Sequence, residues 1–197
     1  MARQEGEALK IVGIYSFNHG KEEVEKRYPI LLGEIKHIID SIDSTKFKTK
    51  VSEEKTMPGR MLFNPTELNR AFKDMFAKHR WVPVRVQCDY PSGYFVPDYK
   101  VRSKNKGAFR EMDFIKEKLG VEVQFGKYAF MVYNVCAKMT IFKNMGYIDC
   151  GVEIVSVKAF TDEMSTGVSY FEQFIWDLEA RGVGDIDIPV LILGIDA

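Results

Sequence analysis

Two short apolar segments, residues 112–115 (MDFI) and 121–125 (VEVQF), decide the fold of this chain. The stretch between them, Lys-Glu-Lys-Leu-Gly at 116–120, predicts a β-hairpin with a slightly long loop. Side chains alternate along a strand, so Glu122 and Gln124 are expected on one face and their apolar neighbours on the other. The hairpin would bring Asp113 alongside Glu122.

Asp113 and Glu122 would place two carboxylates between apolar strands. Such a pair is costly unless a cation neutralises it. Mg²⁺ suits the pair, because it takes oxygen ligands and keeps waters that can contact phosphate. A bound divalent ion could assist hydrolysis of a phosphodiester. By itself the pattern D-x8-E-x-Q is weak, because a solvent-facing hairpin edge gives acids at the same spacing.

Charge is unevenly distributed around this hairpin, although 28 basic and 28 acidic residues sum to zero. Residues 149–197 hold ten acids and two bases, whereas the first 148 residues hold 26 bases and 18 acids. Between Lys46 and Lys127, 18 bases meet 10 acids. A charge run is usually a solvated face. The alternative is a basic cleft that faces a polyanion.

Strands and helices alternate outward from the hairpin and predict an α/β fold with a mixed central sheet flanked by helices. We expect strands at 9–15, 81–86, 148–157 and 189–195, and helices at 21–42, 65–78, 128–142 and 169–180. Pro29 could kink the first helix. Asn64 caps the second, with Pro65 at its first position and Glu67 three residues after the cap.

The 197 residues suit a single domain spanning 1–197, with an irregular basic excursion at about 89–107 that could form a binding loop. Hydrophobic residues make up 46% of the chain, which excludes global disorder. The three cysteines have no metal-type spacing and fit a reducing compartment. No apolar run is long enough for a membrane span. We therefore expect a cytoplasmic protein without a membrane partner.

The hairpin residues resemble the PD-(D/E)xK nuclease motif. Asp113 followed by Glu122-Val123-Gln124 is similar to the variant with Gln where most members carry Lys, which is typical of type II restriction endonucleases of the BglII and BstYI kind. Further matches to this kind follow in chain order and cover most of the chain, and the region 82–111 departs most. They are 41–43 (SID), 54–56 (EKT), 63–65 (FNP) with Leu68-Asn69, 122–128 (EVQFGKY), Met164-Ser165 with Gly167, Ser169-Tyr170, and 191–195.

The resemblance implies catalytic roles for Asp113, Glu122 and Gln124, with Asp113 and Glu122 as Mg²⁺ ligands. Gln124 departs from the wider motif, because a neutral amide can orient water but cannot serve as its base. Asn69 or Glu67, on the preceding helix, could complete the site. Helix capping explains Glu67 equally well.

The same resemblance implies that sequence reading comes from other residues. Lys127 matches a lysine that reads bases in the major groove, where it can donate to guanine. Ser165 and Thr166 match a serine pair on a recognition loop. Without the resemblance, Lys127 would be interpreted as a solvated lysine at the start of a helix, and Ser165 and Thr166 as a helix N-cap.

The resemblance therefore implies a restriction-endonuclease-like nuclease domain that acts as a homodimer with Mg²⁺. It would cut double-stranded DNA at a palindromic hexamer containing GATC, either RGATCY or AGATCT, and leave 5′ overhangs. Two-fold symmetry is the simplest way to read a palindrome. A cognate DNA methyltransferase is expected in the host. The alternatives are a DNA repair or recombination nuclease, a non-catalytic DNA-binding protein, and a small-molecule enzyme.

Overall fold

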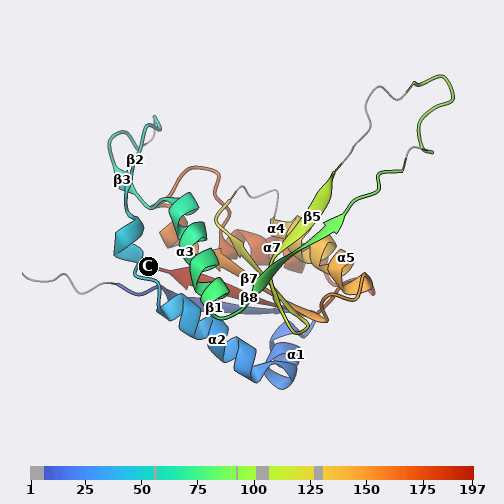
Figure 1. Ribbon diagram of the computed structural model, residues 1–197. Helices are drawn as coiled ribbons and strands as arrows, with labels where there is room; N and C mark the ends of the chain where they lie inside the picture. The colour runs from blue at the N-terminus through green and yellow to red at the C-terminus, as the bar shows by residue number, and fades with distance from the viewer. Residues whose placement is uncertain (1–6, 56, 92, 101–106, 127–130) are drawn as a thin grey trace, which may run out of the picture.

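A six-stranded mixed sheet lies at the centre of the computed structural model, which describes residues 7–55, 57–91, 93–100, 107–126 and 131–197 (Figure 1). Strands β6, β7 and β8 run parallel, and the other neighbouring pairs are antiparallel. Across the sheet the order is β1 (Lys10–Phe17), β8 (Val190–Asp196), β7 (Cys150–Ser156), β6 (Leu119–Gln124), β5 (Phe109–Lys116) and β4 (Val82–Gln87). The predicted mixed α/β fold is confirmed.

Helices cover both faces of this sheet. One face carries α2 (Pro29–Asp40) and α3 (Pro65–Lys78), and α1 (Gly20–Arg27) packs near the start of β8. The other face carries α4 (Met131–Tyr133), the π-helix Asn134–Lys138 and α5 (Met139–Asn144), followed in the chain by α6 (Lys158–Thr161) and α7 (Phe171–Arg181). A 3-10 turn (Ser44–Phe47) and a small hairpin of β2 (Lys50–Val51) and β3 (Met61–Leu62) precede α3. Within the described ranges, none of the helices has the length and apolar character needed to span a bilayer.

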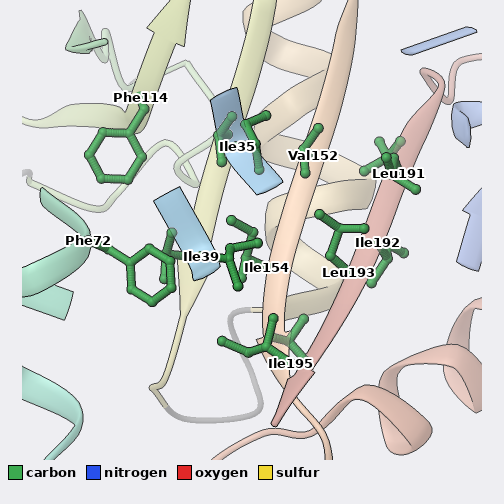
Figure 2. Close-up of a cluster of buried hydrophobic side chains, with 14 of the residues drawn as sticks. Ile35, Ile39, Phe72, Phe114, Val152, Ile154, Leu191, Ile192, Leu193 and Ile195 are labelled. Atoms are coloured by element: carbon green, nitrogen blue, oxygen red, sulfur yellow. The ribbon is translucent and has the colours of Figure 1, made fainter. Parts of the chain in front are cut away.

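The core is densest around the central strands β7 and β8. Every residue of β7 is buried, because helices lie over both faces of the strand. Figure 2 shows Val152 and Ile154 of β7 beside Ile35 and Ile39 of α2. The alternate residues of β7, which include Gly151 and Glu153, point to the opposite face, where a Cβ added to Gly151 would lie 2.4 Å from the sulfur of Met139. This alternation fixes which helix each β7 side chain meets.

Several elements follow the prediction closely, and one helix does not. Helix α3 has the expected bounds, and the Asn64 side chain accepts hydrogen bonds from the backbone N–H groups of Thr66 and Glu67. The predicted helix over 21–42 is instead two helices. Pro29 lacks an N–H and disfavours helical geometry in the residue before it, and Tyr28 accordingly leaves the helix with φ −131° and ψ 43°.

The hairpin that decides the fold is tighter than expected. Lys116 pairs with Leu119, so the connection is the two-residue turn Glu117-Lys118, in which Glu117 adopts φ 54°. The predicted slightly long loop is therefore wrong, because three of its five residues extend the strands. No helix or strand occurs at 89–91, 93–100 or 107, the described parts of the expected irregular excursion. Figure 1 shows this segment reaching away from the sheet.

A buried carboxylate fixes the turn between α7 and β8. The side chain of Asp187 is fully buried and 2.6 Å from the Arg181 guanidinium, while the N–H of Gly184 donates to it at 2.7 Å. Paired hydrogen bonds from a guanidinium give such contacts both strength and direction. The turn delivers the chain into β8.

We predict that Asp187→Ala lowers the free energy of unfolding by about 2–3 kcal/mol. A fully buried ion pair that loses one partner costs about 3–5 kcal/mol, and Arg181 keeps part of its hydration. Urea denaturation measures the change. The matched control is Asp185→Ala, an exposed acid in the same turn, which should stay within about 0.5 kcal/mol of the unmodified protein. Equal losses for the two variants would contradict this account of the turn.

Candidate active site

The β5–β6 hairpin opens where its two acids face each other. Its ladder pairs Phe114 with Val121, and one residue farther along Asp113 lies opposite Glu122. There the backbone N–H of Asp113 donates to Glu122 Oε1 at 3.2 Å, and the N–H of Val123 donates to Asp113 Oδ2 at 3.2 Å. Side-chain oxygens therefore take the place of the ladder partners. The structure brings the two predicted metal ligands together at the end of the paired hairpin.

Three side chains that the sequence did not single out complete this cluster. Lys138 of the π-helix places its Nζ 2.7 Å from Glu122 Oε2. Asn134, at the other end of the π-helix, donates to Gln124 Oε1 at 3.4 Å and to Glu153 Oε1 at 3.3 Å. Glu153 is the register partner of Glu122 on the parallel strand β7. Its Oε2 is buried and has no hydrogen-bond partner within the described part of the chain.

Burial raises the pKa of two carboxylates in this cluster, those of Glu122 and Glu153. Loss of hydration raises the pKa of Glu122 to about 8; the nearby charge of Asp113 adds to the rise, and Lys138 opposes it. Burial likewise raises the pKa of Glu153 well above its ordinary value, with a further contribution from Glu122. A cation that enters this cluster would relieve the repulsion between the carboxylates.

Every member of the cluster except the fully buried Glu153 lines a pocket of about 620 Å³ that has a basic rim. Asn69, Arg70 and Lys73 of α3 line it from one side, and Arg110 of β5 contributes a further guanidinium. The pocket therefore combines anionic groups with four basic side chains, one of them Lys138. This combination suits a phosphodiester. Its phosphate can pair with the Arg and Lys side chains, and a cation can bridge the phosphate and the carboxylates.

The structure separates the two candidates for an additional active-site residue. Asn69 lines the pocket, whereas the Glu67 carboxylate accepts a hydrogen bond from the Thr49 hydroxyl and is not among the lining residues. Asn64 caps the helix through the N–H of Glu67. The geometry therefore favours Asn69 as the residue that could meet a substrate.

The predicted recognition residues lie away from the acids. Ser165 accepts a hydrogen bond from Lys50 at 2.5 Å, and the N–H of Thr166 donates to Glu54 at 3.1 Å. Both line a second pocket, of about 540 Å³, together with Arg60. Lys127 is outside the described residues.

The sequence did contain signals for the missed residues. Glu153 interrupts an otherwise apolar run, CGVEIVS, within the predicted strand 148–157, and a carboxylate among apolar residues requires a partner if it is buried. Asn134 and Lys138 are four residues apart in the predicted helix 128–142, a spacing that puts both on one face. Only the parallel register of β6 and β7 shows that these signals converge on Glu122.

The cluster fits a hard divalent cation by the chemistry of its donors. Asp113 and Glu122 would supply two carboxylate ligands, and Mg²⁺ is commonly bound by one or two carboxylates with waters and substrate phosphates. Across the residues that the structure describes, no group of three or more His, Cys, Asp and Glu side chains is arranged to hold a metal ion. Glu153, the register partner of Glu122, adds a second buried carboxyl group beside this donor pair.

Comparison with known proteins gives a consistent result. The sequence model described as "Restriction endonuclease BglII/BglIII" matches residues 12–195. The type II restriction enzyme BglII of Bacillus subtilis is 23% identical over 191 residues, which cover 93% of this chain and 75% of that protein. The crystal structure of BglII complexed with a DNA 16-mer has a TM-score of 0.67 at 20% identity, with 97% of this chain and 79% of that chain covered. The crystal structure of free BglII has a TM-score of 0.59 at 20% identity, with 97% of this chain and 80% of that chain covered.

The raised pKa of Glu122 should make the stability of the metal-free protein depend on pH. Between its ordinary value of 4.5 and about 8, the folded protein retains a proton that the unfolded chain has released. The stabilisation from this group is therefore complete below pH 4.5 and is lost as the pH rises through about 8, with a slope of at most about 1.4 kcal/mol per pH unit for one proton.

Urea denaturation in EDTA at several pH values from 5 to 8 measures this dependence. We expect the free energy of unfolding to fall as pH rises, and Glu122→Gln to flatten the curve. Identical slopes for the two proteins would show that Glu122 does not titrate in this range.

Proposed function

The chain belongs to the restriction endonuclease BglII/BglIII family and is a type II site-specific deoxyribonuclease; from this premise we propose that it uses Mg²⁺ to cut double-stranded DNA at a palindromic hexamer containing GATC. The observation that carries the proposal is the opened hairpin, in which Asp113 faces Glu122 inside a basic-rimmed pocket. Family membership implies dependence on a divalent metal in general, and the oxygen-only donor pair favours Mg²⁺.

Each group in the pocket has a proposed task. Asp113 and Glu122 would hold the ion, which when bound would lower the pKa of water and stabilise charge on the phosphate. Gln124 would orient the attacking water, because its amide can donate and accept hydrogen bonds but cannot take up a proton at neutral pH. Asn69 would contact the water or the scissile phosphate from α3, and Arg110 would bind an adjacent phosphate.

A hydrogen bond from Asn134 holds the Gln124 side-chain amide in one orientation. Its Oε1 accepts the Asn134 amide, which leaves its own N–H groups as the donors that can face the pocket. An amide held in this way can position a water without accepting its proton. Water activation would then depend on the cation and on the substrate phosphate.

Base recognition would come from the loop at Ser165 and Thr166. Lys50 and Glu54 hold this loop through the Ser165 hydroxyl and the Thr166 N–H. A fixed loop presents its side chains to base edges at a low entropic cost. We further propose that Lys127 donates to guanine in the major groove. These residues would read RGATCY or AGATCT, and cleavage would leave 5′ overhangs.

The proposed working form is a homodimer of single nuclease domains. A two-fold axis would present one active site to each strand of a palindrome. The host would need a cognate DNA methyltransferase to protect its own sites. All three cysteines are free thiols, which fits a cytoplasmic enzyme.

The proposed specificity predicts discrete cleavage of DNA at GATC-containing hexamers. The protein is incubated with Mg²⁺ and a plasmid that carries mapped RGATCY hexamers, and the ends are sequenced. We expect cuts within these hexamers and 5′ overhangs; cutting limited to AGATCT would select the narrower site. Cuts directed by DNA structure instead of sequence would contradict the proposal and favour a repair or recombination nuclease.

The proposed metal site predicts that binding and cleavage can be separated. Glu122→Ala should slow cleavage by at least about 100-fold, because loss of a residue that only supports a metal ligand already costs about 10- to 100-fold. Its affinity for a cognate duplex in Ca²⁺ should stay within about threefold of the unmodified protein. Asp74→Ala, an exposed acid on α3, is the matched control and should cut normally. Normal cleavage by Glu122→Ala would overturn the site assignment.

A further inference from the structure

The π-helix Asn134–Lys138 is an unusual element to find beside a metal-type carboxylate cluster. Such turns are rare, and they occur frequently at functional sites. Both of its end residues point to the cluster: Asn134 contacts Gln124 and Glu153, and Lys138 contacts Glu122. The turn therefore delivers an amide and an ammonium to the pocket from one short segment.

Lys138 is largely withdrawn from water. Its side chain is 12% exposed, and that of its partner Glu122 is 3% exposed. An ammonium group loses hydration at a high cost unless it is well paired. Its charge also acts on Glu153, the buried register partner of Glu122. Lys138 is thus the counter-charge for more than one carboxylate.

The two oxygens of Glu122 are held separately. Oε1 accepts the N–H of Asp113 at 3.2 Å, and Oε2 lies 2.7 Å from Lys138 Nζ. A carboxylate held at both oxygens cannot rotate without losing a partner. Each oxygen retains capacity for a further ligand, because a carboxylate has about four acceptor positions. The arrangement fixes Glu122 opposite Asp113.

Because residue 124 is a glutamine, strand β6 has no positively charged side chain at this position. The PD-(D/E)xK motif that this hairpin resembles usually has a lysine at the position of Gln124, and here the amide is held by Asn134. Lys138 and Gln124 both line the same pocket. An ammonium is therefore present beside the carboxylates, although it comes from the π-helix.

We propose that Lys138 is a positioning residue for DNA cleavage, which holds the Glu122 carboxylate toward Asp113 and supplies the positive charge that Gln124 lacks. This inference rests on the proposed role of Glu122 as a metal ligand. Lys138 acts through Glu122, so its loss should impair both the binding of a divalent cation and the rate of cleavage. Its loss should leave DNA affinity almost unchanged.

The test compares Lys138→Met, Lys138→Arg and the matched control Lys143→Met, which alters an exposed lysine on α5. Ca²⁺ binding to the DNA-free protein is measured by calorimetry, and single-turnover cleavage is measured with a cognate duplex. We expect Lys138→Met to weaken Ca²⁺ binding about tenfold and to slow cleavage about 100-fold. The dissociation constant for the duplex in Ca²⁺ should change less than about threefold. Lys138→Arg should recover at least tenfold of the lost rate, and Lys143→Met should behave as the unmodified protein.

The proposal is overturned if Lys138→Met cuts at the normal rate, or if it binds Ca²⁺ as tightly as the unmodified protein or more tightly. Tighter binding would show that the ammonium competes with the cation. The proposal also fails if Lys138→Arg is folded and no better than Lys138→Met. Failure of the unmodified protein to cut GATC hexamers would count against the proposed specificity instead, and the Ca²⁺ measurement would still test Lys138.

Circular dichroism shows whether each variant is folded. Lys138→Met leaves two buried carboxylates facing each other, so it could unfold the protein. If the single variant is unfolded, the same measurements are made on the double variant Lys138→Met/Glu153→Gln. This variant removes one buried carboxylate together with the ammonium, so two buried carboxylates no longer face each other. The proposal expects weak Ca²⁺ binding and slow cleavage from the double variant. Normal values for both would contradict it.

Discussion

The burial of the Glu122 carboxylate within an apolar sheet is the constraint on which the rest of the site depends. An ion withdrawn from water costs several kcal/mol unless its surroundings compensate. The compensation comes from three directions: the backbone N–H of Asp113, the ammonium of Lys138, and the cation that the cluster is suited to hold. Glu153 increases the demand, because it adds a second buried carboxylate on the neighbouring strand. The buried carboxylates therefore favour the binding of a positively charged group even in the absence of DNA.

The central sheet supports this cluster of buried carboxylates. Glu122 and Glu153 stand on adjacent parallel strands whose opposite face packs against α2 and α3, as Figure 2 shows for Ile154 and Phe72. Sites on strands are held more precisely than sites on loops. The chain bears no net charge, yet Arg70 and Lys73 bring part of its basic section to the rim of the pocket. DNA binding therefore depends on local fields, which salt screens.

Much of this arrangement could be predicted from local sequence. Strand alternation places Glu122 and Gln124 on one face, and the capping residues of α3 give its start correctly. The resemblance carried by the Asp113 and Glu122-Val123-Gln124 pattern identifies the family, which the comparisons confirm.

The remainder depends on contacts between distant segments. The partnership of Glu122 with Glu153 requires the parallel register of β6 and β7, and that of Glu122 with Lys138 requires the π-helix. Neither can be deduced from hydrophobic periodicity.

Every role proposed for this pocket depends on the binding of a divalent cation by Asp113 and Glu122 at the opened end of the hairpin. The most direct test of this binding is anomalous diffraction from crystals grown with Mn²⁺ and a duplex containing the hexamer. We expect a Mn²⁺ peak within about 2.5 Å of an oxygen of each carboxylate. Bound DNA with ordered Mn²⁺ that contacts neither residue would contradict it.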